Sequence, residues 1–120
     1  EHVVVDFFQW LKEIANGDEI CLWSQGSDFD IAILRNICQQ FQIDLPVSYK
    51  NFRDHRTFFL EGARIILDAA QQPYDPNRAY SLVEPYEGDG VAHDPIYDCK
   101  RSIYSTWQMM KHLKCLNIEK

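Results

Sequence analysis

The stretch WSQGSDFDIAIL, residues 23–34, joins two apolar patterns of different period. The apolar run that ends in it is short and uninterrupted, which predicts a buried strand over residues 19–23. The apolar positions after it recur at steps of three and four residues and predict a helix over residues 29–41. The apolar face of this predicted helix consists of Ile31, Leu34, Cys38 and Phe41. A buried strand that leads directly into a helix is typical of an α/β fold.

Two carboxylates, Asp28 and Asp30, stand at this junction between strand and helix. A carboxylate just before a helix can accept hydrogen bonds from the first backbone N–H groups, and this capping role is predicted for Asp28. A carboxylate in the first turn is kept ionised by the helix dipole, and an ionised carboxylate is what a hard divalent cation binds. Asp30 is therefore either part of the helix start or a metal ligand.

The remainder of the chain continues this alternation of helices with short extended segments. The patterns predict helices over residues 3–15, 57–70 and 95–114, an extended segment over residues 48–54, and a proline-rich loop over residues 71–92. The chain length suits one domain, so residues 1–120 are predicted to form a single α/β domain with parallel strands. Few strands are visible for such a sheet, which suggests that further strands precede this chain.

Large apolar side chains and cysteines are predicted to lie mostly in the core. The apolar stripe of the last predicted helix consists of Ile96, Cys99, Ile103, Trp107, Met110 and Leu113. The tryptophans, each on an apolar stripe, are Trp10, Trp23 and Trp107. The cysteines, which lack the spacing of metal ligands and are predicted to be reduced, are Cys21, Cys38, Cys99 and Cys115.

The net charge of −6 disfavours binding of nucleic acid through a broad basic surface. It is compatible with a site whose carboxylates hold cations, because the cations offset the charge there. No run approaches the roughly 18–20 apolar residues of a membrane helix, and no signal peptide is visible. Together with reduced cysteines, these features predict a cytoplasmic protein without membrane contact.

A second stretch with chemical potential is GVAHDPIYDC, residues 90–99, in which Asp98 follows His93 by five positions. Taken alone, it has a plain structural explanation, with His93 in a loop and Asp98 complementing the dipole of the next helix. Combined with Asp30, it offers two carboxylates at helix starts and one histidine. Two Mg²⁺ or Mn²⁺ ions on such oxygen ligands can stabilise phosphodiester cleavage, while a neutral histidine takes the proton from water.

These stretches resemble the motifs of the DEDDh 3′–5′ exonucleases. GSDFDIAIL resembles the second motif of that family, and HDPIYD matches its last motif, His-x-x-x-x-Asp. The stretch NFRDHRT, residues 51–57, and the ending VAHDPIYDC are most similar to the phage exonuclease A type. The three motifs occur in the order of the family and span residues 23–110.

The resemblance implies a ribonuclease H-like exonuclease fold and roles for individual residues. Asp30 and Asp98 are expected to bind metal, and Phe29 is expected to pack beneath Asp30. His93 is expected to act as the general base that activates water. Asp28 matches no catalytic position of the family, so its predicted role stays that of a helix cap.

Arg53 and Arg56 are further candidates because they flank Asp54 at the end of a predicted strand. They either contact substrate phosphate or form a structural pair with Asp54. Phe29 is a third candidate for substrate contact. The long loop of residues 71–92 is another feature that could border a substrate groove.

One part of the family pattern is absent. The first motif of the family, Asp-x-Glu on the first strand, supplies two further metal ligands, and no Asp-x-Glu occurs in these 120 residues. Asp6 has Phe8 where the glutamate should stand, and it lies too close in sequence to Asp30 for the intervening strands. We therefore expect a domain that lacks its N-terminal strands and is inactive, or nearly so, by itself.

Three classes of function are consistent with these observations. The leading one is a metal-dependent 3′–5′ exonuclease that acts on the 3′ ends of single-stranded nucleic acid, with DNA favoured over RNA by the phage-type resemblance. The second is a non-catalytic domain that binds nucleic-acid ends or another protein. The third is a plain α/β interaction domain in which the site residues coincide by chance. Open sheet edges also predict association, either as a homodimer or with the missing N-terminal segment.

Overall fold

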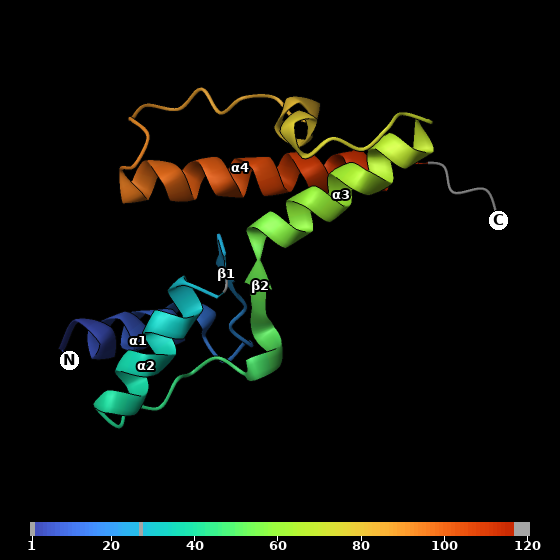
Figure 1. Cartoon of the computed structure of the whole chain (residues 1–120). Helices are drawn as coiled ribbons and strands as arrows, with labels where there is room; N and C mark the ends of the chain where they lie inside the picture. Colours follow the sequence, from blue (N-terminus) through green and yellow to red (C-terminus); the bar gives the residue numbers. More distant parts are fainter. Residues whose placement is uncertain (1, 27, 117–120) are drawn as a thin grey trace. The chain divides into compact units, whose positions relative to one another are not determined.

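The computed structural model describes residues 2–26 and 28–116 of the chain. The chain divides into two compact units, residues 1–55 and 56–120. That these two units form a single domain stays a prediction. The described residues form four α-helices, two short 3₁₀ helices and two parallel strands (Figure 1), which confirms a small α/β fold. Among these residues, no helix combines the length and the apolar character that a membrane span requires.

The N-terminal unit contains two helices and both strands. Its elements are α1 (His2–Ala15), β1 (Leu22–Ser24), α2 (Asp30–Gln40), the 3₁₀ helix η1 (Tyr49–Asn51) and β2 (Phe52–Asp54). α1 ends where Asn16 and Gly17 adopt φ angles of 47° and 91°, the left-handed conformation in which helices commonly terminate. The strand predicted over residues 19–23 is shorter and begins later, because backbone pairing extends only as far as the short partner strand β2.

The two strands are parallel and lie side by side (Figure 1), with Leu22 opposite Phe52 and Ser24 opposite Asp54. A parallel pair requires a crossover connection, and α2 lies within it. Both strands consequently end at the same edge of the sheet, at Ser24 and Asp54. The buried apolar residues of this unit are Phe8, Ile31, Cys38 and Val47.

The C-terminal unit is built from two long helices and the segment between them. Its elements are α3 (His55–Ala69), which starts at the boundary of the units, the 3₁₀ helix η2 (Pro76–Leu82) and α4 (Pro95–Lys114). The core cluster, in which every member is 0% exposed, consists of Phe59, Ala63, Ala79 and Met109. Because Ala79 belongs to η2, part of the segment predicted to be a loop is a core element.

A glycine on α3 lets the two long helices of this unit approach closely (Figure 1). A Cβ atom added at Gly62 would lie 2.9 Å from both Cγ and Sδ of Met109, closer than side-chain packing normally permits. The Met109 side chain therefore occupies the space that a larger residue at position 62 would fill. This contact determines which face of α4 lies against α3.

The apolar stripe that was predicted to be buried on α4 is mostly exposed instead. Ile103 and Trp107 are 69% and 52% exposed, whereas Gln108 and Met109 are buried. The face of α4 that carries Met109 meets the small residues of α3, as the Gly62 contact shows. Periodicity identifies an apolar stripe, but it does not identify which face a neighbouring helix will cover.

Other predictions of burial were also wrong. Trp10 and Trp23 are 54% and 38% exposed, and Trp10 is shielded partly by Phe7, with ring centroids 6.1 Å apart on the same helix. Among the cysteines, all free, Cys38 is buried, whereas Cys21, Cys99 and Cys115 are exposed. Burial raises the pKa of the Cys38 thiol. In the N-terminal unit, a sheet of two short strands offers little area for covering Trp10 and Trp23.

Candidate functional site

The turn between β1 and α2 is held by a carboxylate from the end of β2. The backbone N–H of Gly26 donates to Oδ1 of Asp54 at 3.3 Å, and Gly26 has a φ of 90°, a conformation that favours glycine. The N–H of Phe29 donates to the carbonyl of Gly26 at 3.1 Å. Asp54 thereby ties the end of one strand to the loop that follows the other, and this places the start of α2.

The position of this turn corrects two predictions. Phe29 occupies the N-cap position of α2 without a side-chain cap hydrogen bond, so the prediction that Asp28 caps the helix was wrong. The reason is that the turn closed by Gly26 and Phe29 sets the helix start one residue later. Phe29 is 67% exposed, so the prediction that it packs beneath Asp30 was wrong as well.

Asp30 itself lies where the sequence placed it, in the first turn of α2. Its carboxylate is exposed, and the N-terminal end of the helix dipole favours a negative charge there. In sequence, Asp30 comes shortly after the end of β1, at the edge of the sheet where both strands end. In open parallel sheets, ligands usually bind beyond that edge.

The two arginine candidates differ in their surroundings. One guanidinium nitrogen of Arg53 donates to the carbonyls of Lys50 and Phe52, at 2.6 and 3.1 Å. Part of the donor capacity of Arg53 is thus used by the backbone of its own segment. Arg56 is exposed near the start of α3. Contact of either arginine with phosphate stays a prediction.

The start of α4 is capped by an aspartate that precedes a proline. Asp94 Oδ2 accepts a hydrogen bond from the N–H of Tyr97 at 3.2 Å, and Pro95 occupies the first turn. An oxygen acceptor before the helix and a proline at its first position are the typical signals of a helix start. They place Asp98 in the first turn, as predicted.

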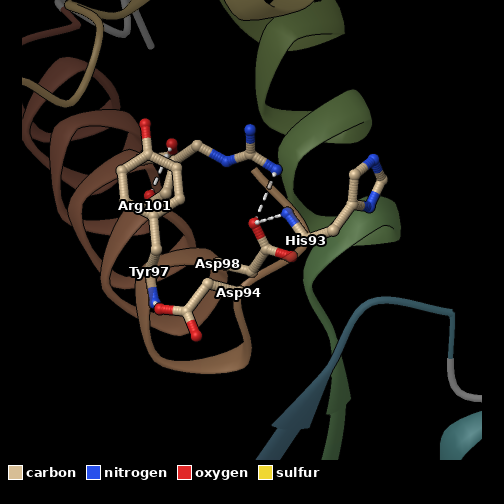
Figure 2. A network of polar contacts seen from close by, with 6 residues as sticks. His93, Asp94, Tyr97, Asp98 and Arg101 are labelled. Atoms are coloured by element: carbon tan, nitrogen blue, oxygen red, sulfur yellow. Dashed lines mark hydrogen bonds and ion pairs between the residues drawn. The ribbon is translucent and has the colours of Figure 1, made fainter. Parts of the chain in front are cut away.

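His93 and Asp98 are brought together by the backbone rather than by their side chains. The N–H of His93 donates to Oδ1 of Asp98 at 3.3 Å, and a guanidinium nitrogen of Arg101 lies 3.5 Å from the same oxygen. His93 has a φ of 73°, an uncommon left-handed conformation for a residue other than glycine. Figure 2 shows that the imidazole ring extends away from the carboxylate of Asp98.

This arrangement joins two of the three predicted site residues. His93 and Asp98 both belong to the C-terminal unit, whereas Asp30 belongs to the N-terminal unit. Within residues 2–26 and 28–116, no group of three or more His, Cys, Asp or Glu side chains is arranged to hold a metal ion. The donor chemistry of Asp30 and Asp98 suits Mg²⁺ or Mn²⁺, but the number of ligands that the described residues bring together is too small for a complete site.

Sequence reasoning missed the supporting roles of Asp54, Asp94 and Arg101. The Asp-Pro pair at positions 94 and 95 is a recognisable helix-start signal and could have identified Asp94. Arg101 follows Asp98 by three positions, a spacing at which side chains meet on a helix, and this too could have been read in advance. The contact of Asp54 with Gly26 joins residues 28 positions apart, and no local pattern indicates it.

Comparison with protein families gives one match. A family model described as the 3′-5′ exoribonuclease Rv2179c-like domain matches residues 1–108. No curated protein matches the chain. No solved structure matches it either.

Proposed function

The chain belongs to the family of 3′-5′ exoribonuclease Rv2179c-like domains, and from this premise we propose that it forms part of an enzyme that removes nucleotides from the 3′ end of single-stranded RNA. The match over residues 1–108, which includes Asp30, His93 and Asp98, is the observation that carries the proposal. The description of the family names RNA, so RNA replaces DNA as the favoured substrate.

We assign the domain to the DEDDh type on its motifs and on local geometry. A strand, a tight turn and a helix that begins at Asp30 give the second motif its context. The last motif has a helix start that places Asp98 in the first turn and His93 just before it. A ribonuclease H-like fold is the architecture that this assignment implies, and the similarity to the phage exonuclease A type rests on the motifs alone.

His93 is the proposed general base. Its side chain is exposed and extends from the loop rather than pairing with Asp98, so a neutral imidazole nitrogen can accept the proton of an attacking water (Figure 2). Its left-handed backbone is a strained conformation of the kind that is often retained at functional sites. Since its N–H is bound by Asp98, the direction of the imidazole depends on that carboxylate.

Asp30 and Asp98 are the proposed metal ligands of this chain. A bound pair of Mg²⁺ or Mn²⁺ ions would stabilise the charge on the attacking and leaving oxygens. The contact of Asp98 with Arg101 joins side chains that are 35% and 46% exposed, and an ion pair of this exposure contributes little to stability. Asp98 can therefore exchange this partner for a cation at low cost.

The small number of metal-binding carboxylates in this chain also limits its expected nuclease activity. Because no Asp-x-Glu occurs in the 120 residues, two carboxylates of the DEDDh pattern would have to come from outside them. We propose that this stretch of chain by itself hydrolyses RNA slowly or not at all. Sequencing the gene on the 5′ side of the Glu1 codon tests directly whether an apolar strand ending in Asp-x-Glu is encoded there.

The activity is tested with an oligoribonucleotide that carries a fluorescent label at its 5′ end, in Mg²⁺ and in EDTA. We expect the full product of the gene to shorten it stepwise from the 3′ end, only with the metal. His93→Ala should slow trimming by roughly 10²–10⁴-fold, the usual contribution of a general base. His112→Ala, an exposed histidine in the last turn of α4, is the matched control and should trim normally.

The outcomes separate the parts of the proposal. Full trimming by His93→Ala, or no metal-dependent trimming by the full gene product, would refute the proposed function. Trimming by the 120-residue chain alone would refute only its proposed inactivity.

A non-catalytic function is the second candidate, and the small number of metal ligands among the described residues favours it. In that case the chain would bind RNA 3′ ends or a protein without cleaving. Binding of a labelled oligoribonucleotide by the full gene product, with no shortening in Mg²⁺ or Mn²⁺, would identify this function.

A further inference from the structure

One flank of α4 is rich in aromatic and basic side chains over most of its length, beside the buried Gln108. Because an α-helix has 3.6 residues per turn, positions three and four apart share a face. The aromatic–basic face consists of Tyr97, Lys100, Arg101, Tyr104, Trp107 and Lys111. The single carboxylate of the helix, Asp98, lies to one side of this face. A concentration of cations here contrasts with the net charge of −6 of the chain.

Tyr86, from the segment before α4, connects the rings of this face into a row. Tyr104 and Trp107 have centroids 6.1 Å apart, and Tyr86 lies 5.8 Å from Tyr104 and 5.6 Å from Tyr97. Trp107 is 52% exposed, so about half of its side chain is accessible to a ligand. The row thus extends along the helix from Tyr97 to Trp107.

Two cations of the face lie over its rings. The guanidinium carbon of Arg101 is 5.8 Å from the centroid of Tyr97, and Nζ of Lys111 is 4.3 Å from the centroid of Trp107. Cation–π contact holds these long side chains along the ring row instead of leaving them free to move in solvent. The positive charges of Arg101 and Lys111 therefore lie next to aromatic rings on the same side of α4.

The row starts at the candidate catalytic residues. Arg101 contacts Asp98, Tyr97 is the neighbour of Asp98 in sequence, and the N–H of His93 is bound by the same carboxylate (Figure 2). Lys111 follows Tyr97 by 14 residues, a rise of about 21 Å at roughly 1.5 Å per residue. That length accommodates a few nucleotides.

We propose that the aromatic–basic face of α4 binds the single-stranded RNA that leads to the 3′ end, with bases stacked on the ring row and phosphates beside the cations. Proteins that hold single strands without reading sequence combine these two features. The carboxylate of Glu84, 3.4 Å from the hydroxyl oxygen of Tyr104, disfavours phosphate at that point. The phosphates therefore follow Lys100 and Lys111. This inference rests on the proposed function, because it supplies the path of that substrate.

Binding is measured by the fluorescence anisotropy of a 5′-labelled oligouridylate in EDTA, where metal-dependent hydrolysis cannot occur. Trp107→Ala should weaken binding by about 5- to 150-fold, the range for loss of one stacked base. Trp10→Ala is the matched control, since Trp10 is 54% exposed on α1, and it should change affinity less than about twofold. Circular dichroism confirms that both variants are folded.

A second pair of variants tests the phosphate contacts. Lys111→Gln should reduce the slope of log K against log salt by about 0.7, the value for one contact with single-stranded nucleic acid. Lys12→Gln, in the last turn of α1, removes the same charge elsewhere and should leave the slope unchanged.

Three results would overturn the inference. One is an affinity that is the same in Trp107→Ala as in Trp10→Ala, together with an unchanged salt slope in Lys111→Gln. Another is the absence of any binding by the unaltered chain. The third is competition by polyglutamate as strong as that by RNA at equal charge, which would assign the face to an acidic protein. Absence of hydrolysis affects none of these measurements, so failure of the proposed function is distinguishable.

Discussion

Replacement of Met109 by alanine tests which face of α4 is covered in the C-terminal unit. Met109 is 0% exposed and belongs to the core cluster with Phe59 and Ala63. Truncation of a buried methionine costs about 2–5 kcal/mol, through lost transfer free energy and the cavity that remains. Because the Phe59 ring is stacked on Tyr80 at 4.5 Å, it cannot readily move into the cavity. We expect a decrease of about 3 kcal/mol in the free energy of unfolding, near the middle of that range.

The adjacent Met110 is the matched control. Met110→Ala changes the same residue type on the same helix, so the difference in helix propensity cancels between the two variants. Met110 is 40% exposed, and no core cavity is created by its truncation. Burial of a whole methionine side chain is worth about 1.5–3 kcal/mol, so loss of its buried part should cost about 1 kcal/mol.

Urea unfolding followed by far-ultraviolet circular dichroism measures both free energies. The dependence on urea concentration should be the same in all three proteins, since a changed slope would indicate a changed unfolded or native state. Hydrogen exchange of the α3 and α4 amides locates the effect in the C-terminal unit. If Met110→Ala costs as much as Met109→Ala or more, the stripe predicted from the sequence is the buried one, and the face of α4 assigned to RNA is not available.

Three further predictions concern the site and its support. Asp94→Ala removes the acceptor for the N–H of Tyr97 and should lower the free energy of unfolding by about 1 kcal/mol, whereas an Asp94→Asn variant that is equally destabilised would contradict capping. Asp54→Ala should speed hydrogen exchange at the Gly26 amide, measured by NMR, and an unchanged rate would show that this bond does not hold the turn. Cys38 should react with a thiol reagent only after unfolding, while the three exposed cysteines react at once; all four reacting together would refute its burial. Burial raises the pKa of the Cys38 thiol, so the folded state favours the protonated form. The stability that this preference contributes is complete below the ordinary thiol pKa of about 8.5 and is lost as the pH rises through the raised pKa. Cys38→Ala should remove this decline, which urea unfolding at several pH values measures.

Local sequence patterns predicted the helices well. Apolar periodicity and terminal signals located α1, α3 and α4 to within two residues at either end. These signals succeed because a helix is formed by hydrogen bonds between near neighbours, so the residues that favour or end it lie inside it or next to it. The placement of Asp30 and Asp98 in first turns followed from the same local rules.

The predictions failed where contacts between segments distant in sequence determine the local structure. Asp28 was expected to cap α2, but a turn held by the carboxylate of Asp54 sets the helix start instead. The segment expected to be a plain loop contains η2, because Ala79 fills a space between elements that lie far from it in sequence. Contacts of this kind produce no recognisable pattern in the local sequence.

The sequence by itself determined the types of local structure, the acidic balance, and the two motifs that carry candidate metal ligands and a general base. Helical spacing alone also places several aromatic and basic residues of α4 on one side of that helix. Only the tertiary structure decided that Trp107 is exposed while Met109 is covered, because burial depends on which surfaces meet and not on which are apolar. For the same reason, only the structure revealed that His93 is joined to Asp98 through its backbone, which leaves the imidazole directed away from the carboxylate.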